Sequence, residues 1–395
     1  MARIQDVYGL FEKIQSADIS VYQQRCVAVR NRNASCMRCA DACTSGAISI
    51  QNNELVISPE RCIGCGTCAT VCPTCALEAH RPNDAELQKA AVAAMQANDG
   101  VAVLACRRIV DSARDLVDAK KIVAVECLGR IEESLVTSLV VAGARKIVMV
   151  KSDCEACEHT KGLSTACAVR DTSNELLRVW QNPVRVEISD KFPGSVRATE
   201  KAPYDERRRN FFFRAKDEAT RVAGIAADEA AKKTLGIEDA PEPPRYVKVM
   251  DDGTLPHFIP DRRERLLDNL AELGEPLDEL IETRLWGHVV IDPDTCISCR
   301  MCATFCPTGA IQKFDDEDGT IGIDHYPGDC VRCRCCEDIC PSNALTLYDE
   351  VLAEDLLSGG VEHNVMHPPK YDMSSSKRTR TMFRDILGCE DIFDR

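Results

Sequence analysis

The sequence predicts a chain of several mixed α/β domains, in which two related cysteine-rich modules flank a small parallel sheet. The segments 26–80 and 296–348 repeat the same order of a cysteine cluster, a short strand pair around a polar turn, and a second cysteine cluster. Between them, short apolar runs alternate with helix-period segments, which is typical of parallel βαβ units. The length of 395 residues is enough for two or three domains.

The composition favours a reduced protein in which cysteine serves as a metal ligand. The chain carries 24 cysteines, and most of them fall in C-x-x-C groups, unlike the framework of a small secreted protein. The N-terminal segment 1–20 lacks the apolar core of a signal peptide, and no apolar run is long enough to span a membrane. We therefore expect a cytoplasmic protein that reaches a membrane only through partners.

The net charge of −14 bears on the partners of the chain. It argues against nucleic acid, whose phosphates repel an acidic surface, and it favours docking on basic faces of other proteins. The sequence contains no G-x-G-x-x-G or P-loop motif, so we expect no nucleotide or flavin site within this chain.

Two complete cysteine motifs lie in the C-terminal repeat. Both have the spacing C-x2-C-x2-C-x3-C-P, in which three cysteines of one loop bind one cubane and the fourth binds the neighbouring cubane. One predicted [4Fe–4S] cluster is held by Cys296, Cys299, Cys302 and Cys340. The other is held by Cys330, Cys333, Cys336 and Cys306. Zinc is the alternative, but zinc sites rarely repeat four cysteines at this spacing.

The N-terminal repeat departs from this spacing in its first motif, because Asn33 occupies the position of the leading cysteine. We predict that Cys26, ten residues before Cys36, supplies the missing ligand across a loop. The first predicted [4Fe–4S] cluster is then held by Cys26, Cys36, Cys39 and Cys72. The second is held by Cys62, Cys65, Cys68 and Cys43. The alternatives are a [3Fe–4S] cluster that leaves Cys26 free, and Cys75 in place of Cys26.

These motifs resemble those of the bacterial two-cluster ferredoxin family, present twice as in polyferredoxin-type electron-transfer subunits. The resemblance covers the two terminal repeats and implies a ferredoxin-like βαββαβ fold around each pair of clusters. The chain departs from the family pattern at Asn33, at Thr44 where proline is usual, and in the additional cysteines Cys75 and Cys335.

Strands and helices alternate between the two repeats. Helices are predicted over 84–98 and 131–140, and each is followed closely by a glycine, Gly100 and Gly143. The apolar runs GVAVLAC, KKIVAVEC and ARKIVMVKSDC, followed by NPVRVEIS, predict the strands of a small parallel sheet.

Cysteines follow three successive strands of this sheet. Cys106 ends the first run, Cys127 ends the second, and Cys154 and Cys157 follow the third. Because the carboxyl ends of parallel strands meet at one edge of a sheet, we expect these side chains to converge. Such a group could hold a [2Fe–2S] cluster or a zinc ion, act as dithiols, or be structural. His159 is an alternative ligand, although we expect it to lie at the surface.

The same segment resembles the small iron–sulfur (delta) subunit of hydrogenases that dock on heterodisulfide reductase. The sequence CLGR, which begins at Cys127, matches the Cys-x-Gly-Arg segment of that family. Cys154 and Cys157 match its closing pair at a tighter spacing, and its leading pair is reduced here to Cys106. That family binds a [2Fe–2S] cluster, so the resemblance implies that these four cysteines hold one.

The remaining segments contain no ligand cluster. Helices are predicted over 204–233 and 261–273, separated by the linker APEPPR. The sequence ERRRNFFFR is similar to a twin-arginine signal, but it is internal and lacks the following apolar run, so we expect a solvated helix. The predicted domains are 1–82 and 286–350 (two-cluster modules), 83–192 (α/β iron–sulfur domain), 193–285 (helical connector) and 351–395 (an extended tail that docks on a partner).

The sequence thus predicts an electron carrier with four [4Fe–4S] clusters and one [2Fe–2S] cluster. The resemblances imply a non-catalytic subunit of a larger anaerobic oxidoreductase, with catalytic or flavin-containing partners of the hydrogenase, formate or aldehyde oxidoreductase, or heterodisulfide-reductase-like kind. The alternatives are an enzyme that reduces disulfides at Cys154 and Cys157, a cluster-based redox sensor or scaffold, and a freely diffusing polyferredoxin. The cysteines expected to bind no cluster are Cys75, Cys167, Cys335 and Cys389.

Overall fold

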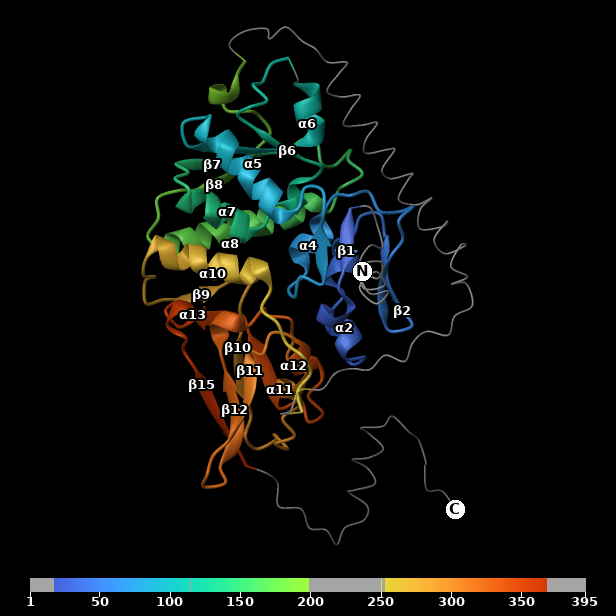
Figure 1. The fold of residues 1–395 in the computed structure, drawn as a ribbon, viewed down its shortest axis with the longest axis vertical. Helices are drawn as coiled ribbons and strands as arrows, with labels where there is room; N and C mark the ends of the chain where they lie inside the picture. Colours follow the sequence, from blue (N-terminus) through green and yellow to red (C-terminus); the bar gives the residue numbers. More distant parts are fainter. Residues whose placement is uncertain (1–17, 114, 199–249, 251–252, 368–395) are drawn as a thin grey trace, which may run out of the picture.

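The computed structural model describes residues 18–113, 115–198, 250 and 253–367, and it has the mixed α/β architecture with small sheets that the sequence predicts (Figure 1). In the N-terminal module, β1 pairs with β4 and β2 pairs with β3, both antiparallel. Its elements are β1 (Ile19–Val21), the 3-10 turn η1 (Gln23–Arg25), α2 (Val27–Arg30), α3 (Arg38–Ala42), β2 (Ile48–Gln51), β3 (Glu54–Ile57), α4 (Thr67–Val71) and β4 (Leu77–Ala79). The strands form two separate pairs, and the specific βαββαβ arrangement stays a prediction.

Two asparagines fix the turn between β2 and β3. Asn52 and Asn53 have φ angles of 50° and 62°, which are typical of a type I′ hairpin turn and are tolerated by asparagine. The hairpin buries Ile48, Leu55 and Ile57 in the core of the module. It thereby returns the chain from the first cysteine motif to the second.

The central domain is built on a four-stranded parallel sheet in the order β6-β5-β7-β8, which confirms the predicted parallel strands. One face of the sheet packs against α5, α7 and α8, and the other is covered by side chains that include Val117, Ile122 and Val196. The elements are α5 (Asp84–Gln96), β5 (Val101–Cys106), α6 (Arg107–Ser112), β6 (Val123–Val125), η2 (Leu128–Arg130), α7 (Glu133–Val141), β7 (Lys146–Val150), α8 (Gly162–Val179), β8 (Val186–Ser189) and η3 (Gly194–Val196).

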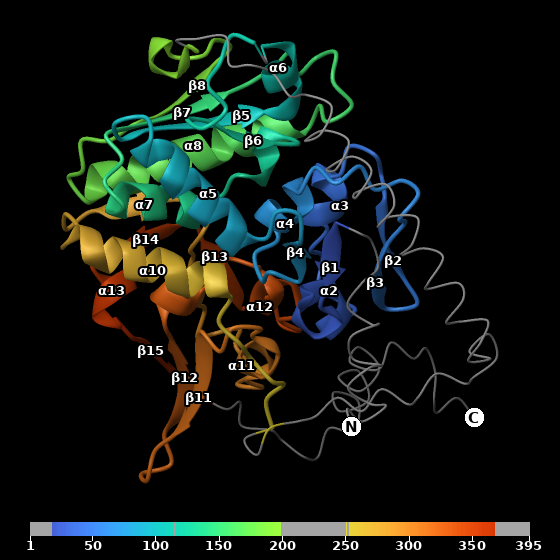
Figure 2. The ribbon, with the colours of Figure 1, turned by 45° about the horizontal axis from the view of Figure 1, so that its top comes forward.

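Helix α10 (Asp261–Leu273) lies between the central domain and the C-terminal module (Figure 2). On the side of the central domain it packs along α7, where Asn269 Nδ2 donates to Ser134 O, Thr137 Oγ1 and Ser138 Oγ at 3.1, 3.0 and 2.9 Å. Its leucines also join a core that contains the fully buried Trp286. The apolar spacing that predicts this helix therefore serves two neighbours at once.

The C-terminal module contains antiparallel pairs β10–β13, β14–β9 and the three-stranded sheet β11-β12-β15. Its elements are β9 (Leu280–Glu282), β10 (His288–Ile291), α11 (Met301–Phe305), β11 (Ile311–Asp315), β12 (Ile321–His325), η5 (Pro327–Asp329), α12 (Cys335–Asp338), β13 (Leu345–Tyr348), β14 (Glu350–Leu352), α13 (Asp355–Ser358) and β15 (Glu362–Met366). Residues 351–367, which fall in the predicted tail, contain α13, β15 and all of β14 except Glu350, and they bury Val351, Leu356 and Met366.

Some predictions fall outside the described residues. These are the helix over 204–233 with the sequence ERRRNFFFR, most of the segment 1–20, the tail beyond residue 367, and Cys389. Among the residues that are described, no helix is long and apolar enough to cross a membrane.

Candidate iron–sulfur sites

The first predicted ligand set draws on separate elements of the N-terminal module. Cys26 lies between η1 and α2, Cys39 lies in α3, and Cys72 follows α4. Burial raises the pKa of Cys39, and the negative charges of Cys72, Cys26 and Cys36 raise it further. Burial is also the main cause that raises the pKa of Cys26 to about 11, with contributions from Cys72 and Cys36. The four thiols therefore form one electrostatic group, and Cys26 is part of it.

The second predicted set surrounds a pocket in the same module. The pocket is lined by Cys43, Cys62, Cys65 and Cys68, together with apolar side chains of β1, β2 and β3. Burial raises the pKa of Cys68, and the other three thiols and Cys39 raise it further. Gly64 and Gly66, with φ angles of 66° and 75°, allow the loop to wrap around the pocket. A hollow of four thiols with apolar walls fits a cluster that is shielded from water.

In the C-terminal module, the last cysteine of each motif lies near the thiols of the other motif. Burial raises the pKa of Cys302 to about 12, and the neighbouring charges that add to it are those of Cys299, Cys340 and Cys296. For Cys336 burial comes first, and the neighbouring thiols that raise its pKa are Cys333, Cys330, Cys306 and Cys302. Cys340 thus lies near the thiols of the first motif and Cys306 near those of the second. Cys299 is exposed, so the first of these sets reaches the surface.

A serine or threonine stands two residues after the last cysteine of each of the four motifs. This regularity was not among the features that predicted the ligand sets. The sulfur–oxygen distances are 3.5 Å for Cys43 and Ser45, and 3.8 Å for Cys72 and Thr74, Cys306 and Thr308, and Cys340 and Ser342. The backbone N–H groups of Ala47, Ala76 and Ala344 also donate to the sulfurs of Cys43, Cys72 and Cys340 at 3.3, 3.2 and 3.3 Å. Such donors stabilise a thiolate ligand. The repeated Ser or Thr is a signal that the sequence contains.

The central cysteines converge at the carboxyl edge of the parallel sheet. Cys106 is the last residue of β5, Cys127 follows β6, and Cys154 follows β7. Burial raises the pKa of Cys127 to about 12, and the charges of Cys65, Cys106 and Cys154 contribute. Burial likewise raises the pKa of Cys154, and Cys106 and Cys157 add to the effect. The structure therefore brings together the four cysteines that the sequence groups.

The spacing of the donors bears on the kind of metal group that they fit. Within the described residues, no group of three or more His, Cys, Asp or Glu side chains lies close enough to share one metal ion. The ligands of an iron–sulfur cluster bind different irons of a larger core, whereas the four ligands of a zinc ion meet at one point.

Close packing connects the central site to the N-terminal module. A side chain at Gly162, the first residue of α8, would bring its Cβ to 2.1 Å from Cys127 Sγ. A side chain at Gly129 would bring its Cβ to 2.4 Å from Thr67 Oγ1 of α4. These two glycines allow η2, α8 and α4 to meet, so that Cys127 lies next to Cys65 of the second set.

His159 is buried, which corrects the expectation of a surface residue. Its side chain is 8% exposed, and its backbone N–H donates to Cys157 Sγ at 3.4 Å. Burial lowers the pKa of His159, and its Nδ1 has no hydrogen-bond partner among the described residues. The lowered pKa favours the neutral imidazole, which is the form of histidine that binds metals.

The two terminal modules pack against each other near their cysteine sets, with α2 beside α12 (Figures 1 and 2). The apolar contact consists of Val27, Ala34, Cys36, Phe305, Cys333, Cys335 and Ile339. Around it, Ser35 donates to Asp338 Oδ2 from its backbone nitrogen and its hydroxyl at 2.6 and 2.8 Å. Arg38 Nη2 donates to Arg332 O at 2.7 Å. The first ligand set of one module therefore adjoins Cys333 of the other.

The additional cysteines of the motifs occupy packing positions. Cys335 lies in the contact between the modules, where burial raises its pKa to about 12. Burial likewise raises the pKa of Cys75 to about 12. Cys167 lies in α8. The expectation that these thiols bind no cluster stays a prediction.

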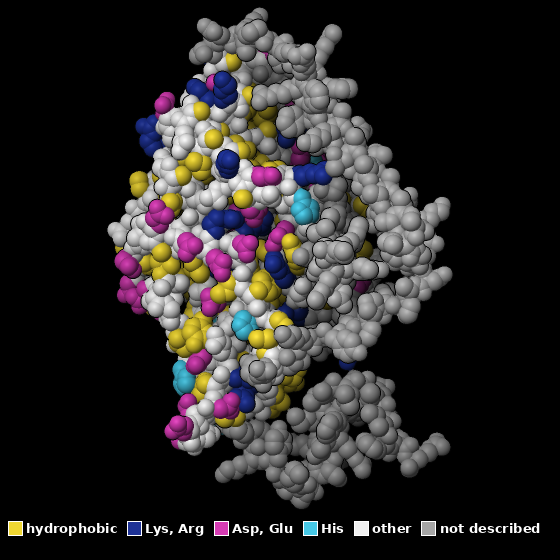
Figure 3. All heavy atoms as spheres, viewed as in Figure 1, with side chains coloured by type: hydrophobic (Ala, Val, Ile, Leu, Met, Phe, Trp, Pro, Cys, Tyr) yellow, Lys and Arg dark blue, Asp and Glu magenta, His cyan; other side chains and the backbone are white. Residues whose placement is uncertain are grey.

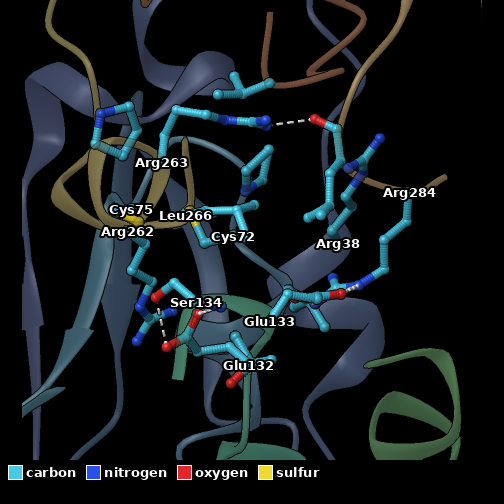
Figure 4. Close-up of a pocket in the computed structure, with 16 residues that line it drawn as sticks. Arg38, Cys72, Cys75, Glu132, Glu133, Ser134, Arg262, Arg263, Leu266 and Arg284 are labelled. Carbon is cyan, nitrogen blue, oxygen red and sulfur yellow. Dashed lines mark hydrogen bonds and ion pairs between the residues drawn. The ribbon is translucent and has the colours of Figure 1, made fainter. Parts of the chain in front are cut away.

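Charged side chains line a pocket where the N-terminal module, α10 and the segments around α7 and Leu285 meet (Figure 4). Arg284 donates to both carboxylate oxygens of Glu133 from Nε and Nη2, at 2.6 and 2.7 Å. Arg262 Nε donates to Asp84 Oδ2 at 2.6 Å, and Arg263 donates to the carbonyl of Leu285. These pairs hold the parts of the molecule together around the first ligand set.

Comparison with known protein families agrees with the geometry of the two ends. Residues 34–76 and 295–344 match the family model of the 4Fe-4S dicluster domain. Cys26 lies outside the matched segments. No curated protein and no solved structure gives a significant match to the chain. The matched segments contain all four motifs of the terminal repeats, so both repeats are similar to a 4Fe-4S dicluster domain and the cysteines there are suited to iron–sulfur clusters.

Proposed function

We propose that the chain is a multi-cluster iron–sulfur subunit that passes single electrons within a larger oxidoreductase complex. The observation that carries the proposal is the packing of two dicluster domains with their ligand sets side by side. Iron–sulfur clusters exchange one electron at a time, at potentials that the surrounding protein sets.

The ligand sets adjoin one another in a continuous order, which supports a conduit. The order runs from the central cysteines through the second and first sets of the N-terminal module to the two sets of the C-terminal module. The pairs that join successive sets are Cys127 with Cys65, Cys68 with Cys39, Cys36 with Cys333, and Cys336 with Cys302. The chain holds these sets in place, and eight of their twenty thiols are buried.

The proposal includes four [4Fe–4S] clusters in the terminal modules and one [2Fe–2S] cluster at the central site. The convergence of Cys106, Cys127, Cys154 and Cys157 supports the fifth cluster, together with the resemblance to the hydrogenase delta subunit. His159 is the substitute ligand if one of these cysteines stays free.

The proposed partners are catalytic or flavin-containing subunits of an anaerobic, cytoplasmic oxidoreductase. The complete chain has a net charge of −14. On the described part of the face in Figure 3, acidic and basic side chains are interspersed. Partners with basic faces would complement the overall charge.

A coulometric titration of the anaerobically purified full chain tests this function. One electron per cluster gives an uptake of about five electrons per chain, with visible bleaching of the clusters and no substrate turnover. An uptake of two electrons or fewer would contradict the conduit.

A second candidate is disulfide reduction at Cys154 and Cys157. It is favoured by the partial exposure of Cys154 and by Lys151, whose charge offsets part of the rise that burial causes in the pKa of this thiol. Turnover of a disulfide substrate that disappears in both Cys154→Ser and Cys157→Ser would favour this enzyme. A full electron uptake without such turnover would favour the carrier over both the enzyme and a redox sensor that loses its clusters.

A further inference from the structure

The two ligand sets that adjoin where the terminal modules pack form the inner sets of the conduit. One holds Cys36 and the other Cys333, and both of these thiols belong to the apolar contact between the modules. The complete inner sets are Cys26, Cys36, Cys39 and Cys72, and Cys330, Cys333, Cys336 and Cys306. The outer sets are Cys62, Cys65, Cys68 and Cys43, and Cys296, Cys299, Cys302 and Cys340.

The inner sets lie deeper in the protein than the outer sets. Their buried thiols are Cys26, Cys306, Cys330 and Cys336. In the outer sets Cys68 is buried, Cys299 is exposed, and the other thiols are intermediate. A reduced cluster carries one more negative charge than an oxidised one, so burial disfavours reduction. By burial alone, the inner clusters would accept electrons less readily than the outer clusters, and the middle of the conduit would be a barrier.

A buried threonine accompanies the last cysteine of the motif in both inner sets. Thr74 is 1% exposed, and its Oγ1 lies 3.8 Å from Cys72 Sγ. Thr308 is 3% exposed, and its Oγ1 lies 3.8 Å from Cys306 Sγ. Within the described residues, neither hydroxyl has another hydrogen-bond partner. Because a thiolate ligand carries no hydrogen, the hydroxyl is the donor in each pair.

The outer sets have serine at the same position. Ser45 Oγ lies 3.5 Å from Cys43 Sγ, and Ser342 Oγ lies 3.8 Å from Cys340 Sγ. The Ser45 contact is the shortest of the four, but both serines are half-buried, so water competes for their hydroxyls. A threonine hydroxyl has fewer rotamers, and a hydrogen bond away from water acts more strongly on a charge. The stronger donors therefore lie at the inner sets.

We propose that the hydroxyls of Thr74 and Thr308 donate to the ligand sulfurs beside them and raise the reduction potentials of the two inner clusters. The inference rests on the proposed function, because it concerns clusters at these ligand sets. A donor to a ligand sulfur stabilises the more negative, reduced state of a cluster. The two threonines thereby offset the effect of burial, and the middle of the conduit still accepts electrons. The serines of the outer sets contribute less.

Potentiometric titration of the anaerobic full chain, followed by EPR, tests the threonines. Thr308→Val keeps the shape of the side chain without its hydroxyl, and it should lower the potential of one cubane without loss of iron. That cubane is identified as the one whose signal is missing from Cys306→Ala. Thr308→Ser keeps a hydroxyl and should bring the potential most of the way back. The matched control Ser342→Ala removes an outer hydroxyl and should produce a smaller shift.

Three results would overturn the inference. One is an unchanged potential in Thr308→Val with full iron content. Another is the same shift in the Val and Ser variants, which would indicate packing alone, and the third is an equal shift in Ser342→Ala. If Thr308→Val loses its cubane, Thr74→Val decides at the other inner set by the same criteria. Wild-type protein without cubanes would contradict the proposed function itself, which the three results above leave standing.

Discussion

Cys26 is the candidate ligand that stands farthest from the spacing of its motif. Between Cys26 and Cys36 the chain forms α2 and then a compact turn, in which Asn33 N–H donates to Asn31 Oδ1 at 2.9 Å and Ala34 N–H to Asn31 O at 3.0 Å. Asn33, at the position of the absent cysteine, is part of this turn. The turn lets Cys26 approach the thiols of its set from the other end of α2.

Replacement of Cys26 by alanine should remove one ligand from one cubane. We expect Cys26→Ala to lose between about one and four irons, through conversion to a three-iron cluster or loss of the cluster. Iron analysis with EPR measures this. The control Cys75→Ala removes another buried thiol and should keep all irons. Full iron and unchanged cubane signals in Cys26→Ala would exclude Cys26, and loss in Cys75→Ala would favour that residue instead.

At the scale of elements, the start of α8 and the turn η2 determine the central site. Gly162 and Gly129 are the positions where added side chains would collide with Cys127 and Thr67. Neither glycine is a ligand, but both set the distance between the sheet edge and α4. The arrangement of the central cysteines in space therefore depends on the backbone that carries them.

Gly162→Ala tests this dependence. Alanine favours helix by about 1 kcal/mol over glycine, so α8 itself should not be weakened. The collision with Cys127 Sγ should nevertheless displace that ligand, and the protein should lose about two irons while its cubane signals stay. Gly194→Ala, where no atom lies within 4 Å of the added Cβ, serves as the control. Retention of the central cluster in Gly162→Ala would show that Cys127 is not among its ligands.

Local spacing predicts the cysteine motifs, the hairpins, the parallel strands and α10, because each depends on neighbouring residues. It does not predict the contact between the modules, since Ser35 and Asp338 lie 303 residues apart. The same holds for Glu362, which reaches His325 only because β15 folds back beside β12. The burial of His159 was missed because the polar sequence around it suggests a surface.

At the scale of the whole molecule, buried charge pairs connect its parts. Glu133 of α7 is 3% exposed and is paired with Arg284, which lies between β9 and β10 of the C-terminal module. Asp84 of α5 is paired with Arg262 of α10 and with Arg130 of η2, and these guanidinium groups outweigh its burial and hold its pKa well below its usual value. Breaking such a pair leaves a charge without a partner in the interior.

Arg284→Ala should therefore destabilise the protein strongly. We expect a loss of about 3–5 kcal/mol in the free energy of unfolding, because Glu133 stays buried without its partner. Arg178→Ala breaks an exposed pair with Glu175 and Glu279 and should cost less than about 1 kcal/mol. Anaerobic denaturant unfolding measures both. Equal, small losses would show that the buried pair does not hold the parts together.

Mössbauer spectroscopy combined with iron and zinc analysis of the anaerobically prepared full chain tests the central claim most directly. The account predicts about 18 irons per chain, of which about 16 belong to cubanes and about two to a two-iron cluster, with no zinc. About 16 irons with one zinc would remove the central cluster and leave the terminal modules as proposed. A total of about eight irons or fewer would contradict a conduit that runs through both modules.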